Sequence, residues 1–308
     1  MTASVFIDGA VGTTGLEIRD RLAGRTDIAV LLLDDDRRKD AAARREVLND
    51  ADFVILCLPD DAAPEAVSLI ANDRTRVIDA SSAHRVDPDW VYGFAELTAE
   101  QRDRIANARF VTNPGCYPTG FLALVAPLVR AGLLPADLPI SINATSGYSG
   151  GGKAMIAEFE SANPAPAFRP YATALGHKHV PEMTTYAGLA HPPIFAPAVA
   201  NLYRGMVVEV PVHLHALPAR PTVAALEETL RAAYAGSPLV TIANAASTIA
   251  IEENAGTDRL TLRVCGNDAT GQARLIATLD NLGKGAGGAA VQNLNLMAGF
   301  DQTAGLVL

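Results

Sequence analysis

The sequence predicts an α/β protein with an N-terminal doubly wound domain, built on a parallel sheet, followed by an α+β domain with a mixed sheet. Short, nearly continuous apolar runs alternate with helical patterns in the first part of the chain, which is typical of a parallel sheet covered on both faces. Beyond about residue 116 the expected strands alternate apolar and polar residues, as half-buried strands do. At 308 residues the chain is long enough for two such domains.

The first domain is predicted from four apolar runs separated by helical spacing. This order lets successive strands lie parallel in one sheet, with helices as the connections. We expect strands at residues 4–10, 27–36, 52–60 and 76–81, and helices at 14–24 and 63–73.

The second domain begins with the strongest helical pattern of the chain. A strand that runs into a glycine-rich loop follows it, and two alternating strands flank a further helix. Residues 161–200 hold many prolines and no clear period, which predicts a loop-rich segment. The expected elements are a helix at 120–134, strands at 139–147, 206–217 and 258–268, and a helix at 222–236, giving a mixed or antiparallel sheet with helices on one side.

Composition excludes several classes of protein. The net charge of −9 argues against nucleic acid as a partner, and no apolar run reaches the ~20 residues of a membrane span. The start of the chain lacks the pattern of a signal peptide. Cys57, Cys116 and Cys265 are odd in number and far apart, which argues against a disulfide framework or a paired zinc motif and favours a cytoplasmic protein.

A glycine-rich stretch follows the first expected strand directly. The sequence DGAVGTTG places Gly9, Gly12 and Gly15 at the junction between that strand and the next helix. Glycines there allow a tight turn and close approach of backbone N–H groups to a pyrophosphate, and Thr13 and Thr14 can add hydroxyl donors. An ordinary turn is the alternative, but the position favours a Rossmann-type dinucleotide-binding domain.

The end of the second expected strand bears on the choice of cofactor. In DDDRRKD, Asp34 lies where an acid would bind a ribose 2′-hydroxyl and favour NAD, whereas Arg37 and Arg38 can bind the 2′-phosphate of NADP. A solvated charged turn is the alternative interpretation. Of the two cofactors, we expect NADP (NADPH).

One cysteine lies in a setting typical of a reactive thiol. In NPGCYPTG, Pro118 marks the first turn of a helix, so Cys116 falls at or just before its N-terminus. The positive helix end stabilises a thiolate there, Gly115 permits a sharp approach, and Asn113 can donate to an oxyanion. A packed core cysteine is the alternative, and it is the interpretation we favour for Cys57 and Cys265.

A nucleophilic cysteine needs an acid/base partner, and the stretch LGHKHVPEM offers a histidine cluster. His177 and His179 lie with Glu182 in an irregular region after a glycine. A His-x-His pair with a nearby carboxylate is also able to bind zinc. No further ligand cluster is evident and a cysteine–histidine site needs no metal, so we predict none.

Five stretches together resemble the N-acetyl-gamma-glutamyl-phosphate reductases, in the shorter of the two forms of that family. They are DGAVGTTG, NPGCYPTG, TSGYSGGGK, GHKHVPE and DNLGKGAGGAAVQNLNLMAGF. The layout is more distantly similar to aspartate-semialdehyde dehydrogenase and glyceraldehyde-3-phosphate dehydrogenase. The resemblance implies that NADPH reduces N-acetyl-L-glutamyl 5-phosphate to N-acetyl-L-glutamate 5-semialdehyde and phosphate, in arginine biosynthesis, through a thioester on Cys116 with His177 as acid/base.

The resemblance also implies further site residues, a domain division and an assembly. The substrate residues would be Asn113, Arg85, Ser149, His179 and Glu182, and Ser81, Asn281 and Lys284 would join the glycine loop and the two arginines at the cofactor. Residues 1–116 would form the dinucleotide-binding domain, completed by a C-terminal helix at 287–308, and residues 117–286 the catalytic and oligomerisation domain. The enzyme would be a homodimer or homotetramer acting on a small acyl phosphate.

Three other functions stay open from the sequence. A semialdehyde dehydrogenase for aspartyl or aminoadipyl phosphate would use the same residues. A non-catalytic nucleotide-sensing regulator would keep the fold but would not need a reactive Cys116. A zinc hydrolase would use the histidine cluster as ligands.

Overall fold

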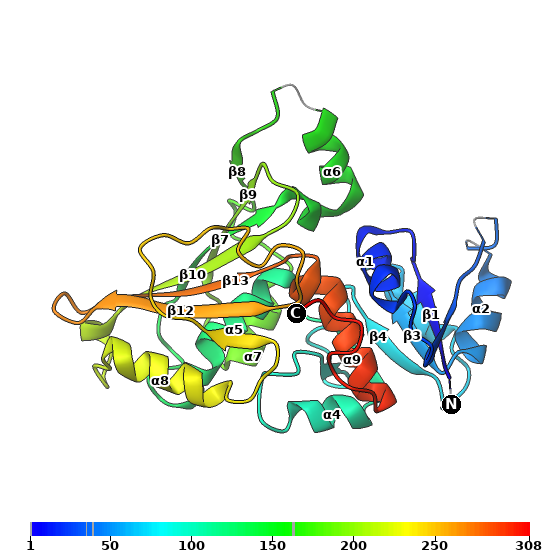
Figure 1. The fold of residues 1–308 in the computed structure, drawn as a ribbon, viewed down its shortest axis with the longest axis horizontal. Coiled ribbons are helices and arrows are strands. Elements are labelled where there is room, and N and C mark those ends of the chain that lie inside the picture. Colours follow the sequence, from blue (N-terminus) through cyan, green and yellow to red (C-terminus); the bar gives the residue numbers. More distant parts are fainter. Residues whose placement is uncertain (1, 35, 39, 162–163) are drawn as a thin grey trace. The chain divides into compact units, whose positions relative to one another are not determined.

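The structure, a computed structural model, describes residues 2–34, 36–38, 40–161 and 164–308. Its contacts divide the chain into two compact units (Figure 1). We call Met1–Ala95, Ala99–Pro114 and Ala286–Leu306 the parallel-sheet unit. Glu96–Thr98, Gly115–Gly285 and Val307–Leu308 form the mixed-sheet unit. Each unit is therefore built from more than one segment of the chain.

The parallel-sheet unit is doubly wound, as predicted. Among the described residues its strands form a six-stranded parallel sheet in the order β2-β1-β3-β4-β6-β5. The order reverses direction between β1 and β3, which opens a crevice at the carboxyl ends of these strands. The strands are β1 (Ala3–Asp8), β2 (Ile28–Leu31), β3 (Phe53–Leu56), β4 (Arg76–Asp79), β5 (Val91–Tyr92) and β6 (Phe110–Thr112), and the helices are α1 (Thr13–Leu22), α2 (Ala41–Asp50), α3 (Ala63–Ser68), α4 (Gln101–Asn107) and α9 (Gly288–Ala298).

Both faces of this sheet are buried, which explains why its strands are apolar at successive positions. Side chains alternate between the faces of a strand. In β1, Val5 and Ile7 join a core cluster with Ile18 of α1, whereas Phe6 joins a separate cluster with Leu48 of α2. A strand covered on one face only would need a polar residue at every second position.

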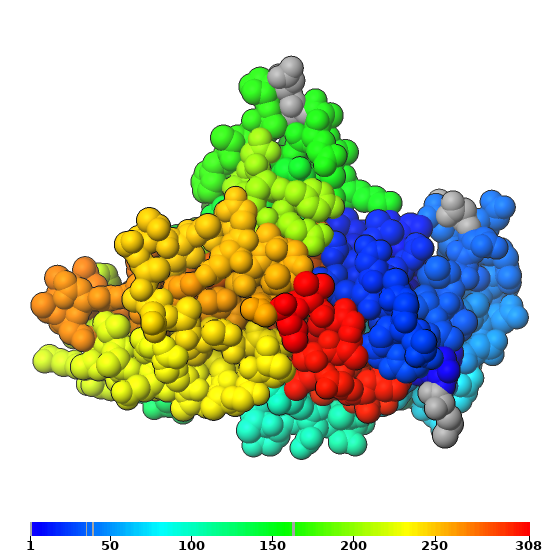
Figure 2. Space-filling model, viewed as in Figure 1, coloured from blue at the N-terminus to red at the C-terminus, as the bar shows by residue number. Residues whose placement is uncertain are grey.

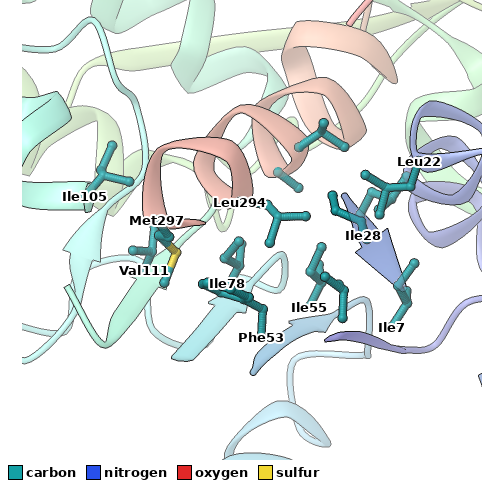
Figure 3. Close-up of a cluster of buried hydrophobic side chains, with 14 of the residues drawn as sticks. Ile7, Leu22, Ile28, Phe53, Ile55, Ile78, Ile105, Val111, Leu294 and Met297 are labelled. Carbon is teal, nitrogen blue, oxygen red and sulfur yellow. The ribbon is translucent and has the colours of Figure 1, made fainter. Parts of the chain in front are cut away.

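The chain's last helix completes the first of these clusters. Leu294 and Met297 of α9 are buried and point toward the strands that carry Ile55 and Ile78 (Figure 3). α9 also contacts α1, α4 and β4. The segment around α9 and its C-terminal side, drawn in red, lies beside residues of the N-terminal segment in blue (Figure 2). Residues nearly 300 positions apart in sequence therefore share one core.

The predicted helix at 287–308 is wrong in its extent. α9 ends at Ala298, where Gly299 takes a left-handed conformation at φ 74° and its N–H bonds back to the last turn. The Phe300 N–H then donates to the Asn295 carbonyl at 2.8 Å, which completes the C-terminal cap. Gly299 is therefore the stop signal of this helix.

The mixed-sheet unit is built on a seven-stranded sheet in the order β11-β12-β13-β10-β7-β9-β8 among the described residues. The pairs β7–β9 and β11–β12 are parallel and the other pairs are antiparallel, which confirms the predicted mixed sheet. The strands are β7 (Ser141–Gly147), β8 (Phe168–Pro170), β9 (Ile194–Ala200), β10 (Met206–His213), β11 (Val240–Ile242), β12 (Leu260–Asn267) and β13 (Gln272–Leu279).

Helix α5 (Cys116–Arg130) forms the centre of this unit and contacts β10, β12, β13 and α8 (Val223–Ala233). Its close approach to the sheet requires Gly120, because a Cβ there would lie 2.9 Å from a methyl carbon of Val208. Two further helices are α6 (Gly152–Ser161) and α7 (Val180–Ala187). None of the helices in the described ranges is long and apolar enough to cross a membrane.

The expectation of a loop-rich segment over residues 161–200 is wrong for much of its length. Within the described residues this segment contains β8, α7 and β9. β9 pairs with both β7 and β8 although its sequence, IFAPAVA, contains Pro197. Proline lacks the N–H that a strand ladder uses, so the sequence alone argued against a strand there.

Candidate active site

Cys116 is the first residue of α5, directly after its N-cap. Gly115 serves as that cap with extended backbone at φ −69° and ψ 153°, and α5 is buried along most of its length. The first N–H groups of a helix have no carbonyl partner within the helix and carry a partial positive charge. A half-buried sulfur at this position lies in a field that favours the thiolate.

Glu182 anchors the turn that leads into this helix. It lies in the first turn of α7, is 1% exposed, and its Oε2 accepts a hydrogen bond from the Gly115 N–H at 3.1 Å. A carboxylate that holds the backbone immediately before the nucleophile fixes where α5 begins.

His177 has a defined arrangement of hydrogen bonds around its ring. The backbone N–H of His179 donates to His177 Nδ1 at 3.1 Å, so this nitrogen must be an acceptor. The neutral ring therefore carries its proton on Nε2, which lies 3.4 Å from the hydroxyl of Tyr171. The Tyr171 hydroxyl donates onward to that of Tyr117 at 3.4 Å, and Tyr117 donates to the Ala198 carbonyl at 3.2 Å. The donors thus all point the same way, away from His177.

The aromatic rings around this chain of hydroxyls pack edge to face. The centroids of His177 and His179 are 4.7 Å apart, and Phe195 lies 5.1 Å from both His177 and Tyr117. Such contacts restrict ring rotation. The imidazole of His177 is therefore held in place by packing as well as by hydrogen bonds.

The two tyrosine hydroxyls remain protonated at ordinary pH. Burial raises the pKa of Tyr171 to about 12, and the nearby charge of Cys116 adds to the rise. Burial raises the pKa of Tyr117 well above its ordinary value, and both Tyr171 and Cys116 contribute.

A tight turn after β13 packs directly against the nucleophile. It is the π-helical turn Gly283–Gly287, in which the Gly285 N–H donates to the Asp280 carbonyl at 2.9 Å. A Cβ on Gly285 would lie 2.9 Å from Cβ of Cys116. A residue larger than glycine would displace the cysteine.

The same turn carries a buried ion pair. Lys284 Nζ lies 2.7 Å from Glu96 Oε2, and both side chains are 1% exposed. An ammonium in such a place needs a carboxylate partner to remain charged. The family resemblance implied a cofactor role for Lys284, whereas in the structure its charge is balanced by Glu96.

Ser149 and Asn281, predicted as substrate and cofactor residues, are hydrogen-bonded to each other. The Asn281 Nδ2 group donates to Ser149 Oγ at 2.9 Å, and Asn281 Oδ1 accepts from the Gly205 N–H at 3.0 Å. Both side chains are buried. The glycine-rich loop after β7 is thereby tied to the segment that precedes the Gly283–Gly287 turn.

In the parallel-sheet unit, the glycine loop lies at the carboxyl end of β1, beside the reversal in strand order. Gly9 has φ 90°, and a Cβ there would collide with the Cys57 carbonyl oxygen. A Cβ on Gly15 would lie 2.5 Å from the Gly9 carbonyl oxygen. Gly12 is the N-cap of α1, so Thr13 and Thr14 supply the first N–H groups of that helix. The loop has the geometry that a pyrophosphate requires.

The two arginines expected at the 2′-phosphate lie in an exposed turn after β2. The N–H groups of Arg37 and Arg38 both donate to the Asp34 carbonyl at 2.9 Å. Arg37 also approaches Glu46 at 3.5 Å while its side chain stays 56% exposed. An exposed pair of this kind is weak and can rearrange around an anion. Asp35 and Lys39 of the same stretch lie outside the described residues.

Arg85 and Asn113 are connected at the carboxyl ends of β4 and β6. Arg85 Nε donates to the Asn113 carbonyl at 3.1 Å, and the Asn113 N–H donates to the Asp79 carbonyl at 2.7 Å. The Asn113 side chain donates to the Ala286 carbonyl and accepts from Asn293 of α9. These contacts fix the orientation of the Asn113 amide.

Comparisons with known proteins identify the family. Residues 116–281 match the model of the semialdehyde dehydrogenase dimerisation domain, and residues 4–106 match that of the semialdehyde dehydrogenase NAD binding domain. The N-acetyl-gamma-glutamyl-phosphate reductase of Chelativorans sp. (strain BNC1) is 53% identical over 96% of this chain and 98% of its own length. That of Brucella suis is 50% identical over 97% of this chain and 100% of its own length. The chain belongs to the N-acetyl-gamma-glutamyl-phosphate reductase family. This confirms the resemblance found in the sequence.

Solved structures of more distant proteins share the fold. Aspartate semialdehyde dehydrogenase from Francisella tularensis superposes with a TM-score of 0.73 at 15% identity, covering 96% of this chain and 100% of that one. The enzyme from Candida albicans, solved with NADP, gives 0.67 at 13% identity, covering 97% and 99%. By its match to the family model, residues 4–106 form an NAD(P)-binding domain.

The structure groups the predicted residues by unit. In the mixed-sheet unit Glu182 accepts the Gly115 N–H just before Cys116, the ring of Tyr117 lies near those of His177 and His179, and Asn281 donates to Ser149. In the parallel-sheet unit the glycine loop, Ser81, Arg85 and Asn113 follow the carboxyl ends of parallel strands, and Arg37 and Arg38 lie in the exposed turn after β2. Within the described ranges, no group of three or more His, Cys, Asp or Glu residues is arranged to hold a metal ion.

Sequence reasoning missed several residues that build this site. Tyr171 and Tyr117 order the proton of His177, Glu96 balances Lys284, and Asn293 orients Asn113. Glu96 lies in none of the five quoted stretches, whereas Asn293 and Tyr117 lie inside two of them without a role that the residues themselves indicate. Tyr171 lies six residues before His177, and that closeness was the one signal available.

Proposed function

We propose that this chain catalyses the NADPH-dependent reduction of N-acetyl-L-glutamyl 5-phosphate to N-acetyl-L-glutamate 5-semialdehyde and phosphate, as a step of arginine biosynthesis. The observation that carries the proposal is the sulfur of Cys116 at the N-terminus of a buried helix, in the unit that also holds the oriented imidazole of His177. Full-length relatives named for this activity are about half identical to the chain, which supports the choice of substrate.

The parallel-sheet unit has features that fit a dinucleotide. A larger side chain at Gly9 or Gly15 would collide with neighbouring backbone, so the loop stays open for a pyrophosphate. Thr13 Oγ1 is buried and has no hydrogen-bond partner among the described residues, as expected of a hydroxyl that meets a phosphate oxygen. We assign Gly12, Thr14 and Ser81 to the same cofactor, and Arg37 and Arg38 to the 2′-phosphate that distinguishes NADP.

The first chemical step belongs to the cysteine. The Cys116 thiolate attacks the acyl carbon, a C–S bond forms, and the C–O bond to phosphate breaks. We assign Arg85 to the phosphoryl group, where a guanidinium can neutralise charge on the leaving oxygens. We assign Ser149, His179 and Glu182 to substrate binding. For Glu182 that role acts through the Gly115 N–H, which it holds.

The second step reduces the thioester. Bound NADPH supplies the hydride. The oxyanion that develops on the former carbonyl needs donors, and we assign these to the Asn113 amide and an N–H at the start of α5. His177 gives the oxyanion its Nε2 proton and takes it back as the C–S bond breaks, releasing aldehyde and thiolate. Asn281 and Lys284, whose partners in the structure are protein groups, support the turn behind Cys116.

An assay in the oxidative direction tests the proposal. Purified protein, N-acetyl-L-glutamate 5-semialdehyde, phosphate and NADP⁺ should form NADPH, with phosphate required and NAD⁺ much less effective. Aspartate semialdehyde and aminoadipate semialdehyde are the matched alternatives. Turnover that prefers either of them would replace the proposed substrate, and no turnover with any aldehyde would favour a regulator.

The proposed enzyme is a cytoplasmic homo-oligomer, a homodimer or homotetramer. A catalytic thiol suits a reducing compartment. The matching family model over residues 116–281 is described as a dimerisation domain. Light scattering on the purified protein distinguishes the two assemblies from a monomer.

A further inference from the structure

The carboxylate of Asp79 ends β4 and is fully buried. Its Oδ1 accepts the Ser81 N–H at 2.8 Å, and its Oδ2 accepts the Ser81 hydroxyl at 2.8 Å. His84 Nδ1 lies 2.6 Å from the same Oδ2. A carboxylate removed from water is stable only when such donors surround it. The loop after β4 is thus folded around this one charge.

The ring of His84 is held in place on its flat face. It stacks on Trp90 with centroids 4.2 Å apart and planes 14° apart, and Trp90 contacts Phe110 at 5.0 Å. Trp90 belongs to the core cluster on the α2 side of the sheet. Because Asp79 is the acceptor, Nδ1 carries the proton that joins the two residues.

Arg85 directly follows His84 and depends on the same residue for its surroundings. Its guanidinium donates to the carbonyls of Asn113, at 3.1 Å, and Ala80, at 3.4 Å. Ala80 is the neighbour of Asp79, and the Asn113 N–H bonds to the Asp79 carbonyl at 2.7 Å. The Ala83 N–H donates to Ser81 Oγ at 3.1 Å and closes the turn between them. Both ends of the short loop that presents Arg85 are therefore tied to Asp79.

We infer that His84 is a positioning residue for the phosphoryl group: its bond to Asp79 sets the place of Arg85. The inference rests on the proposed function, which assigns Arg85 to phosphate. In this role His84 does not replace His177 as the acid/base residue. Its Nδ1–H draws the loop onto Asp79, and the stack on Trp90 keeps that hydrogen pointed at the carboxylate.

Three substitutions separate the hydrogen bond from the ring. His84→Asn keeps a donor close to the position of Nδ1 but loses the stack. His84→Phe keeps the stack on Trp90 but loses the donor. His84→Gln loses the stack, as Asn does, and places its donor about one bond further out. The Asn and Gln variants therefore form a matched pair that differs mainly in the reach to Asp79.

The measurement is the phosphate dependence of N-acetyl-L-glutamate 5-semialdehyde oxidation by the intact enzyme with NADP⁺. We expect the phosphate KM to rise about tenfold in His84→Phe and His84→Gln, as for the loss of one hydrogen bond to a charged group. The phosphate KM of the His84→Asn variant should stay within about threefold of the wild-type value. The KM for NADP⁺ should not change in any of them. His213→Phe, an exposed substitution in the mixed-sheet unit, is the control for the chemical change itself.

The outcomes separate the inference from the function on which it rests. An unchanged phosphate KM in both His84→Phe and His84→Gln overturns the inference. A phosphate KM that rises as much in His84→Asn as in His84→Gln overturns it too. If the Phe variant fails to fold, the Asn and Gln pair still decides. An inactive wild type contradicts the proposed function instead. Calorimetric titration with inorganic phosphate then tests the inference alone, with a weaker Kd expected in Gln than in Asn and equal Kd values contradicting it.

Discussion

The backbone N–H of His179 donates to Nδ1 of His177 at 3.1 Å, and this single contact determines which ring nitrogen holds the proton. With Nδ1 occupied as an acceptor, the exchangeable proton of the neutral ring is on Nε2, beside the Tyr171 hydroxyl. A side-chain donor in that place could rotate away. A backbone N–H at the start of α7 cannot, so the tautomer is built into the fold.

Replacing His177 by Ala should lower kcat by about 10²–10⁴-fold, the usual contribution of a positioned acid/base group. NADPH affinity should change little, because the glycine loop belongs to the other unit. His177→Gln is the matched variant: its amide can donate from about the position of Nε2 but cannot release a proton, so it should be equally slow. A large loss in His179→Ala with an active His177→Ala would reverse the two roles.

Tyr171→Phe tests the hydroxyl chain behind that imidazole. Removing the hydroxyl leaves Nε2–H without its orienting acceptor, and we expect kcat to fall about tenfold, the equivalent of one hydrogen bond of this kind. Substrate KM should stay near the wild-type value. Tyr117→Phe removes the next hydroxyl along, so its effect should be smaller. Equal losses in the two variants would point to general destabilisation, which thermal unfolding measures.

Cys116 and Cys57 should differ sharply in reactivity. Burial raises the pKa of Cys57 to about 12, and the nearby carboxylates of Asp79 and Asp8 add to the rise. Its thiol is therefore protonated at neutral pH and gains thiolate only as the pH approaches that value. Iodoacetamide at neutral pH should modify Cys116 before Cys57, as peptide mass spectrometry can show.

Cys116→Ser should abolish reduction while NADPH binding persists, because a serine hydroxyl is a far weaker nucleophile than a thiolate. Cofactor binding can be followed by the fluorescence of NADPH. Substantial activity in this variant would exclude covalent catalysis, whatever the outcome of alkylation.

Gly9→Ala and Gly24→Ala form a matched pair for the glycine loop. Both glycines have positive φ, at 90° and 77°, so an alanine at either costs about 1–2 kcal/mol of backbone strain. Only Gly9 also faces a collision, with the Cys57 carbonyl, whereas nothing lies within 4 Å of a Cβ on Gly24. Thermal unfolding and NADPH titration should show a larger loss for Gly9→Ala in both measurements. Equal NADPH affinity in the two would argue against the cofactor role of this loop.

Removing one partner of the Lys284–Glu96 pair should lower the free energy of unfolding far more than replacing both partners by apolar residues. Glu96→Gln leaves a buried ammonium without its carboxylate, and we expect about 3–5 kcal/mol of stability to be lost. The double variant Glu96→Leu with Lys284→Met removes both charges and should recover most of that loss. Urea unfolding of the single and double variants provides the comparison. A double variant as unstable as the single one would show that the charges act separately.

The sequence was a good guide where a local pattern carries the structure. The apolar runs that became β1, β3 and β4 needed no knowledge of the rest of the chain, because burial on both faces leaves its mark within each run. The position of Cys116 at the start of α5 followed in the same way from Gly115 and Pro118.

What the sequence did not reveal depends on contacts between distant segments. β9 is a strand despite Pro197 because it lies between β7 and β8, and pairing of that kind leaves no local mark. Asn293 meets Asn113 across 180 residues of chain, so neither residue predicts the other. The early end of α9 is a different case: Gly299 was visible in the sequence, and the cap that it forms was overlooked.

The place of α9 in the parallel-sheet unit has a consequence for biosynthesis. Leu294 and Met297 belong to the same core as strands made from the first hundred or so residues. During translation those strands must leave the ribosome and remain with one apolar face uncovered until the chain has been made as far as α9. Synthesis of the intervening unit therefore separates the two halves of one core in time, and a nascent chain that stalls before α9 exposes a surface prone to aggregation.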